Sequence, residues 1–100
     1  SVENEVVPEE FVLEQNFPNP FNPETIIRYA LPARGSANAG FVKGVVYDIT
    51  GREVATLVNG EMPAGEHQIS FNASGLSSGV YFARFSTADR SSMIKMVLLR

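Results

Sequence analysis

Side chains that could carry acid–base or nucleophilic catalysis are few in this chain. It has one histidine, His67, and two aspartates, Asp48 and Asp89, so a Ser-His-Asp triad would have to be assembled by choosing freely among nine serines. His67 stands in the alternating pattern of a strand, with Ile69 and Phe71 on the same side. We therefore interpret His67 as a strand residue that faces solvent or a neighbouring turn, and we predict no catalytic residue.

Metal ligands are equally sparse. The chain has no cysteine, its single histidine leaves no paired imidazoles, and the spacing of an EF-hand loop is absent. Calcium binding through Asp48, Asp89 or a glutamate stays open, but Asp48 is better explained as the first residue of a turn. Nine glutamates could supply a carboxylate pair for glycoside cleavage, yet four of them lie before position 11, where solubility explains them. We predict no cofactor, no metal and no enzyme activity.

The charge and hydropathy of the chain exclude other classes. Its formal net charge is −3 with a pI of about 5.0, and its eight basic residues are scattered, so it lacks the basic patch of a nucleic-acid-binding protein. Its apolar runs are far shorter than the ~20 residues of a membrane-spanning helix, and we see no signal segment. The leading segment Ser1–Glu10, with four glutamates and Pro8, indicates a solvated linker.

The elements that must position any functional surface are strands, and a proline-rich segment precedes most of them. Asn16–Pro23 alternates prolines and phenylalanines with asparagine. Each proline fixes φ and removes a backbone donor, so this segment can be neither a helix nor a central strand. We expect it to lie extended along the rim of a sheet and to insert Phe17 and Phe21 into the domain.

Short apolar or alternating segments separated by turn residues follow over residues 11–100. No window of about eleven residues keeps apolar positions at helical spacing, whereas about seven strands recur at intervals of about 8–12 residues. The predicted strands are Phe11–Leu13, Thr25–Leu31, Phe41–Tyr47, Glu53–Val58, His67–Asn72, Val80–Thr87 and Met93–Leu99, with a loop at Ala33–Gly40 and turns at Asp48–Gly51, Asn59–Gly60, Gly75–Gly79 and Ala88–Ser91. This pattern predicts an all-β sandwich of two antiparallel sheets around one core.

Two further features concern the sheets themselves. Gly44 is the one glycine inside a predicted strand, which indicates a bulge or the close approach of another backbone. Tyr29, Tyr47, Tyr81 and Phe82 could form a platform on which sugars stack, although aromatic residues in a small sandwich more often belong to the core. A carbohydrate-binding accessory domain is therefore one alternative function.

Three segments together resemble a known family. Leu13–Pro23 looks like the opening motif of the C-terminal sorting domain of type IX secretion cargo proteins in Bacteroidetes-like bacteria, the Por secretion tail. Val46–Val54 is similar to the middle hairpin of that domain. Leu76–Arg84, followed by Lys95–Arg100, resembles its closing pair of strands. The resemblance covers about residues 11–100.

The resemblance implies an immunoglobulin-like β-sandwich over residues 11–100, at the end of a larger secreted precursor, with residues 1–10 as the linker from an upstream passenger domain. In the family, the outer-membrane translocon recognises the domain and a sortase then cuts upstream of it, often joining the passenger to a surface lipopolysaccharide. The implied location is secreted, at the outer membrane or cell surface, and by analogy the cut falls within Ser1–Glu10. The chain departs from the family pattern in the length of Ala33–Gly40 and in the glycine at position 44.

The resemblance also implies which residues a partner recognises. They belong to the proline-rich segment and the last two strands: Asn16, Pro18, Asn19, Pro20, Phe21, Asn22, Pro23, Gly79, Tyr81, Lys95, Met96, Val97, Leu98, Leu99 and Arg100. A terminal strand at a sheet border can pair with another chain through free N–H and C=O groups, so we predict that a dimer can form through edge strands. The flagellar hook-capping scaffold carries a related immunoglobulin-like domain, which makes a structural domain of a hook cap or an adhesive assembly a second alternative.

Overall fold

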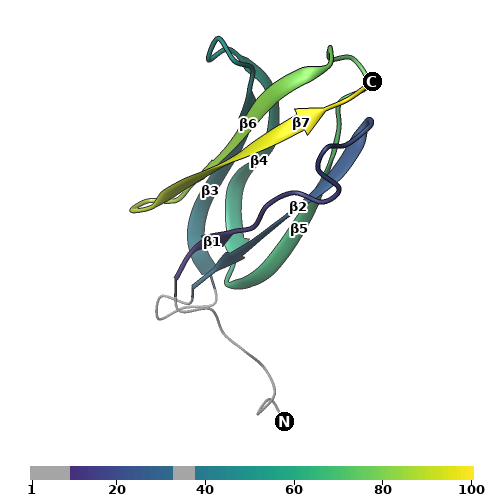
Figure 1. Ribbon diagram of the computed structural model, residues 1–100. Coiled ribbons are helices and arrows are strands. Elements are labelled where there is room, and N and C mark those ends of the chain that lie inside the picture. The colour runs from purple at the N-terminus through teal and green to yellow at the C-terminus, as the bar shows by residue number, and fades with distance from the viewer. Residues whose placement is uncertain (1–9, 33–37) are drawn as a thin grey trace.

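The computed structural model of the chain describes residues 10–32 and 38–100, which form two packed antiparallel sheets (Figure 1). The strands are β1 (Val12–Leu13), β2 (Glu24–Leu31), β3 (Asn38–Tyr47), β4 (Glu53–Pro63), β5 (Gly65–Asn72), β6 (Gly79–Ser86) and β7 (Ser91–Leu98). One sheet has the order β1-β2-β5 and the other the order β4-β3-β6-β7. The described residues contain no helix, so the predicted all-β, immunoglobulin-like sandwich of about seven strands is confirmed.

Two predicted connecting regions lie mostly outside the described residues. Of the linker at residues 1–10, only Glu10 is described, and its carboxylate lies 3.6 Å from the Arg90 guanidinium. Of the predicted loop Ala33–Gly40, residues 33–37 are outside the description, whereas residues 38–40 already belong to β3. β3 therefore begins before its predicted start at Phe41.

The core lies between the two sheets and is built by alternation along the strands. Ile27, Tyr29 and Leu31 of β2 are buried on one side of their sheet, as predicted. The opposite sheet contributes every second residue of β6 and β7: Tyr81, Ala83, Phe85, Ile94, Met96 and Leu98. Each large apolar side chain buried in this way stabilises the fold by roughly 1.5–3 kcal/mol relative to leaving it exposed.

Gly44 lies where β3 passes over the ring of Phe85. A Cβ at this position would be 2.7 Å from Phe85 Cε2, too close for any side chain unless the ring moved. The pairing of β3 with β4 also shifts between Gly44 and Val45, so the predicted bulge is confirmed. The close neighbour, however, is an aromatic ring of the core and not another backbone.

The predicted turn at Asn59–Gly60 is wrong, because β4 continues through it to Pro63. Asn59 and Gly60 pair with Lys43 and Val42 of β3, and β5 begins at Gly65, almost immediately after β4 ends. An Asn-Gly pair favours a turn when it is isolated, but here Val42 and Lys43 of β3 offer this segment a partner strand, and the pairing overrides the local preference.

The predicted turn at Asp48–Gly51 is confirmed, and Asp48 organises it. The Asp48 carboxylate accepts hydrogen bonds from the Thr50 hydroxyl at 2.6 Å, the Thr50 N–H at 2.9 Å and the Arg52 N–H at 3.1 Å. Gly51 has a φ of 89°, which residues with a side chain rarely adopt. The Thr50 hydroxyl, followed by the backbone N–H groups and the Arg52 charge, lowers the pKa of Asp48, although partial desolvation opposes them.

Candidate functional site: the ribbon and the terminal strand

The proline-rich region forms an extended ribbon, residues 10–23, that runs from the border of one sheet to the border of the other (Figure 1). Phe17 and Ile26 of β2 exchange two backbone hydrogen bonds, each of 3.0 Å. Further along, the Phe21 N–H donates to the Val97 carbonyl at 2.9 Å, and the Phe21 carbonyl accepts from the Leu99 N–H at 3.0 Å. The ribbon therefore joins the two sheets, and its predicted place on the rim is confirmed.

Between these backbone contacts, side chains of the ribbon bind the outward backbone groups of β7. The Asn19 Oδ1 accepts from the Val97 N–H at 2.9 Å, and the Gln15 Nε2 donates to the Lys95 carbonyl at 2.7 Å. The outward groups on this part of β7 were expected to be free for another chain. Instead, the ribbon of the same chain occupies them.

Asn16 lies beneath the ribbon and fixes its path. Its side chain is 2% exposed, and its Nδ2 donates to the Thr25 hydroxyl at 2.9 Å and to the Pro18 carbonyl at 3.2 Å. The Thr25 hydroxyl in turn donates to the Pro18 carbonyl at 2.8 Å. Every polar atom of this small network has a partner, as buried polar groups require. Asn16 therefore shapes the surface from within and does not form part of it.

The two phenylalanines of the ribbon have opposite environments. Phe21 is 2% exposed and packs in the core at 6.1 Å from the Phe71 ring, as predicted. Phe17 is 76% exposed, so its predicted insertion into the domain is wrong. The reason lies in its partner: Phe17 pairs with Ile26, which alternates with the core-facing residues of β2, and paired residues point to the same side of a sheet.

The C-terminal residue is bound to the loop between β5 and β6. The Arg100 guanidinium donates to the carbonyls of Ala73 at 3.2 Å, Ser74 at 2.5 Å and Leu76 at 3.0 Å. The Ala73 N–H donates to the carbonyl of Pro23 in the ribbon at 2.8 Å. The same loop thus contacts both the last residue of the chain and the end of the ribbon at Pro23.

The structure divides the predicted recognition residues into two groups. Buried or half-buried residues support the seam between the ribbon and β7: Asn16, Phe21, Pro23, Tyr81, Met96, Val97 and Leu98. Exposed residues lie on its surface: Pro18, Asn19, Pro20, Asn22, Gly79, Lys95, Leu99 and Arg100. Phe17 belongs to this exposed surface but was not among the predicted recognition residues, since we expected it to insert into the domain.

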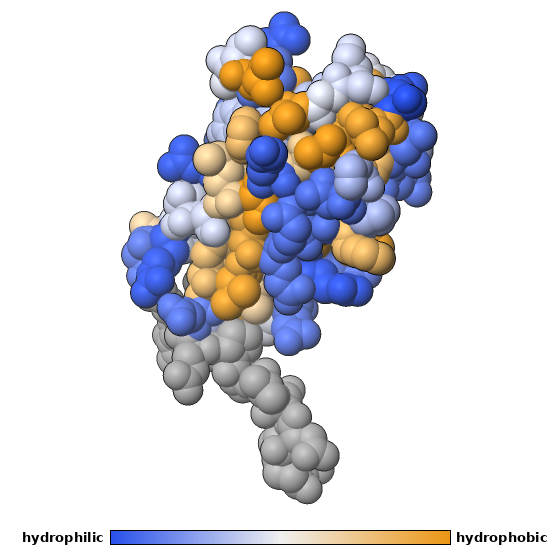
Figure 2. All heavy atoms as spheres, viewed as in Figure 1, coloured by the Kyte–Doolittle hydropathy of each residue, from blue (hydrophilic) through white to orange (hydrophobic). Residues whose placement is uncertain are grey.

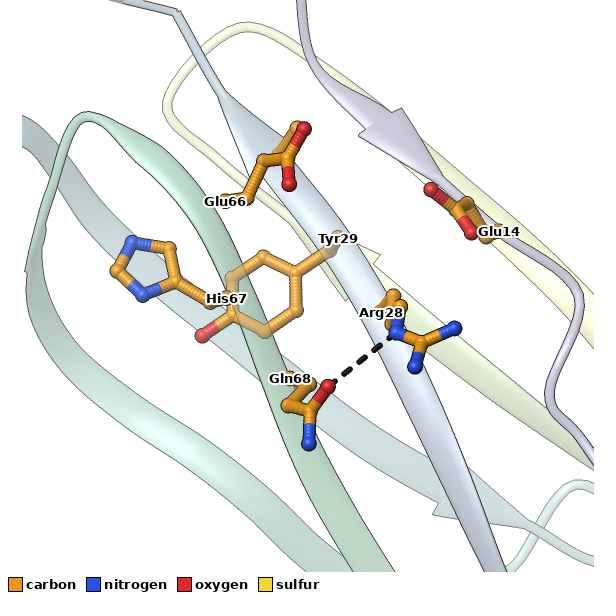
Figure 3. Close-up of a pocket in the computed structure, with 7 residues that line it drawn as sticks. Glu14, Arg28, Tyr29, Glu66, His67 and Gln68 are labelled. Atoms are coloured by element: carbon orange, nitrogen blue, oxygen red, sulfur yellow. Dashed lines mark hydrogen bonds between the residues drawn. The ribbon is translucent and has the colours of Figure 1, made fainter. Parts of the chain in front are cut away.

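A polar hollow of about 210 Å³ lies beside β2 and β5 and is lined by Glu14, Arg28, Tyr29, Ala30, Glu66, His67 and Gln68 (Figure 3). The Arg28 Nε donates to the Gln68 Oε1 at 3.2 Å. The His67 ring stacks on Tyr29, and its Nε2 lies 2.8 Å from the Pro63 carbonyl, so His67 is a strand residue beside a turn, as predicted. Burial raises the pKa of the Tyr29 hydroxyl above its ordinary value.

Gly75–Gly79 has the Gly-x-Ser-x-Gly spacing of a nucleophile elbow, but its structural context differs. An elbow requires a sharp turn from a strand into a helix, and this loop joins β5 to β6 in a part of the chain where the structure shows strands only. The carbonyl of Ser77 accepts the Tyr81 hydroxyl at 2.7 Å. Among the described residues, no group of three or more histidine and acidic side chains could hold a metal ion.

The aromatic residues considered as a sugar platform are divided between the two faces of their sheets. Tyr29 and Tyr81 are buried in the core, whereas Tyr47 and Phe82 pair on the outer face of β3 and β6. The outer pair borders an open hollow of about 370 Å³, together with Asp48, Ile49, Gly51, Arg84 and Met93. On the face seen in Figure 2, hydrophobic residues form patches among hydrophilic ones. A continuous platform of the four rings is not formed.

The described chain is thus a β-sandwich in which the ribbon and the last strand form one surface. The described residues contain no helix that could cross a membrane. A family model for the secretion system C-terminal sorting domain matches residues 15–99, and the chain belongs to this family of type IX secretion signals. The family is one of sorting signals and not of enzymes, and it implies export to the exterior or the cell surface. No curated protein matches the chain.

Proposed function

We propose that this domain is the address of a larger secreted precursor, recognised in its folded form by the outer-membrane translocon of type IX secretion. The observation that best supports this proposal is the family match over residues 15–99, which takes in the proline-rich part of the ribbon, β6 and β7 together. The domain acts by being bound and has no catalytic role of its own.

The translocon, in this proposal, contacts the exposed side of the seam. Lys95, Leu99 and Asn22 present a cation, an apolar side chain and an amide to solvent on neighbouring segments. The exposed ring of Phe17 adds an apolar contact, and two backbone hydrogen bonds to Ile26 hold this residue in place. A rigid surface of this kind favours binding because little conformational entropy is lost when the partner docks.

After transport, the sortase of the same system removes the domain by cutting within residues 1–10, and the passenger is released or joined to the cell surface. This step is carried over from the family and concerns a segment outside the described residues, apart from Glu10. A dimer through edge strands also stays a prediction. β1, β4, β5 and β7 each have a sheet neighbour on one side only, and because the ribbon binds β7, β5 and β4 are the longer border strands left for such a dimer.

The proposal can be tested by fusing residues 11–100 to a secreted reporter in a host that has type IX secretion. The informative variant is Lys95→Glu, which reverses an exposed charge on β7 without removing a core side chain. We expect the wild-type fusion to reach the cell surface and the variant to be retained, with at least about a tenfold loss of surface signal. Immunoblots of the cell-surface and periplasmic fractions measure how much of each fusion is exported and how much is retained.

The matched control is Arg84→Glu, which reverses an exposed charge on the neighbouring strand β6. It should leave transport unchanged, and thermal melts of both purified variants should match the wild type. Equal transport of the Lys95→Glu fusion and the wild type would remove Lys95 from the recognition surface. Failure of the wild-type fusion to leave the cell would contradict the proposed function itself.

A further inference from the structure

The outward side of the four-stranded sheet carries three cations. Val46, Ala83 and Ile94 pair across β3, β6 and β7 and are buried, so the residues that alternate with them face away from the core. These outward residues form three rows across the sheet: Lys43, Ser86 and Ser91; Val45, Arg84 and Met93; Tyr47, Phe82 and Lys95. Each row holds one cation, and none of the three rows holds an acidic side chain. We call these rows the basic face.

The charge of the basic face contrasts with that of the other sheet. The outward charged side chains of β2 and β5 are Glu24, Arg28 and Glu66, that is, two acids and one cation. The chain as a whole has a net charge of −3, so its composition does not explain a positive face. Glu53 and Glu61 also face outward from the four-stranded sheet, but they stand on the border strand β4, on the side away from β7.

Apolar side chains surround the middle cation of the basic face. Arg84 pairs with Met93 of β7, and the Met93 side chain is more than half exposed. Ile49, in the turn that adjoins the face, is also more than half exposed. Together with Tyr47 and Phe82, these residues border the open hollow of about 370 Å³. The face therefore offers exposed apolar surface immediately beside positive charge.

The charges of the basic face are not neutralised by neighbouring acids. Within residues 10–32 and 38–100, no ion pair involves Lys43, Arg84 or Lys95. Asp48 borders the same hollow, but its carboxylate accepts three hydrogen bonds within its own turn and lies 3.5 Å from the Arg52 guanidinium. The three cations are thus available to an anionic partner.

We infer that the basic face binds to a membrane surface that contains anionic lipids. Lysine and arginine side chains near such a surface are attracted to the negative headgroups, and exposed apolar side chains enter the boundary between headgroups and acyl chains. An acidic protein would satisfy the cations but would not by itself explain why Ile49 and Met93 are exposed among them. The inference goes beyond the proposed function, since it concerns the purified chain and a lipid bilayer without any translocon.

The test is the binding of purified residues 1–100 to lipid vesicles, measured by co-sedimentation. We expect binding to phosphatidylcholine vesicles that contain phosphatidylglycerol, and at least about tenfold weaker binding to phosphatidylcholine alone. Arg84→Glu should weaken binding to the anionic vesicles at least about fivefold, and Lys43→Glu should act in the same direction. The matched control is Arg28→Glu, the same charge reversal at an exposed position of the other sheet, which should bind like the wild type.

A second measurement tests the orientation of the domain on the vesicle. The chain has no cysteine, so a single introduced cysteine can carry a polarity-sensitive fluorophore. On anionic vesicles the emission should shift to the blue for Ser91→Cys on the basic face and should not shift for Ser70→Cys on β5, which is also an exposed serine. Met93→Ser should weaken vesicle binding at least about threefold, whereas Phe17→Ser, which removes an exposed ring from the ribbon, should not.

Several results would overturn the inference. They are equal binding of Arg84→Glu and Arg28→Glu, equal binding to anionic and neutral vesicles, and the same fluorescence shift from both labelled positions. Binding to soluble polyglutamate but not to vesicles would assign the basic face to an acidic protein instead. Since Arg84→Glu should lose vesicle binding and keep its transport, failure of this inference can be distinguished from failure of the proposed function.

Discussion

The two outer borders of the four-stranded sheet are protected by different means. At β7, the border is covered by the ribbon, which comes from the other end of the sequence. At β4, the register with β3 leaves Val54 and Leu57 without a paired residue, and Glu53 and Glu61 face solvent. Irregular pairing, charge and covering segments all hinder a strand from pairing with another chain.

This difference has consequences for how each border responds to mutation. The protection of β4 is local, since it depends on the residues of β3 and β4 themselves. The protection of β7 depends on contacts between residues that are more than seventy positions apart, such as Asn19 and Val97. Changes in the ribbon should therefore affect the whole domain, whereas changes near β4 should have limited effects.

The largest effect is expected for Phe21→Ala in the ribbon. The ring is buried against Phe71, so its removal leaves a cavity and should lower the free energy of unfolding by about 3–5 kcal/mol. Urea denaturation followed by circular dichroism measures this change. Phe17→Ala removes an equal side chain from the surface of the same ribbon and should cost less than about 0.5 kcal/mol. Similar losses for the two variants would show that the ribbon is not anchored through Phe21.

A smaller effect is expected for Gly44→Ala in β3, where the pairing with β4 is irregular. The new Cβ would lie 2.7 Å from the Phe85 ring, which is fixed in the core, so the variant should lose about 1–3 kcal/mol of stability. The control is Gly60→Ala in β4, where a Cβ meets nothing within 4 Å, and this variant should be close to the wild type. Thermal unfolding of both proteins tests the difference, and equal melting temperatures would argue against the close approach of Phe85.

Arg100→Ala tests the attachment of the C-terminus at the ribbon end. It removes three hydrogen bonds to the carbonyls of the β5–β6 loop, and because the site is exposed we expect a loss of only about 1 kcal/mol. Arg52→Ala is the control, since this exposed guanidinium lies 3.5 Å from the Asp48 carboxylate and a single exposed ion pair should matter less. Faster amide exchange over residues 73–78 in Arg100→Ala, but not in Arg52→Ala, would confirm the role of Arg100.

The smallest effect concerns the pH dependence of the turn at Asp48. Its pKa is lower in the folded chain than the ordinary value of 3.8, so the ionised form contributes stability above that pH, and this contribution is lost as the pH falls through the folded pKa. Asp48→Asn should therefore flatten the acid side of the stability profile below about pH 4. Glu61→Gln, an exposed carboxylate on β4, provides the control, and an unchanged acid slope in Asp48→Asn would contradict the assignment.

Much of the architecture could be predicted from local patterns. The alternation in β2, β6 and β7 indicates which side faces the core because the period of a strand is two, and the turn at Asp48 follows from an aspartate and a glycine placed three positions apart. The motifs around the ribbon and β7 also predicted the family, which the match over residues 15–99 confirmed.

Other features depend on partners that are distant in sequence. Asn59–Gly60 is a strand because β3 lies beside it, and Phe17 faces solvent because it pairs with an outward residue of β2. The use of asparagine and glutamine side chains to bind β7 is likewise invisible before the ribbon is placed against that strand. The sequence by itself determined the strands, the core faces and the family. The tertiary structure decided which edge is covered and by which atoms, since hydrogen-bond partners far apart along the chain are specified only when the sheets have packed.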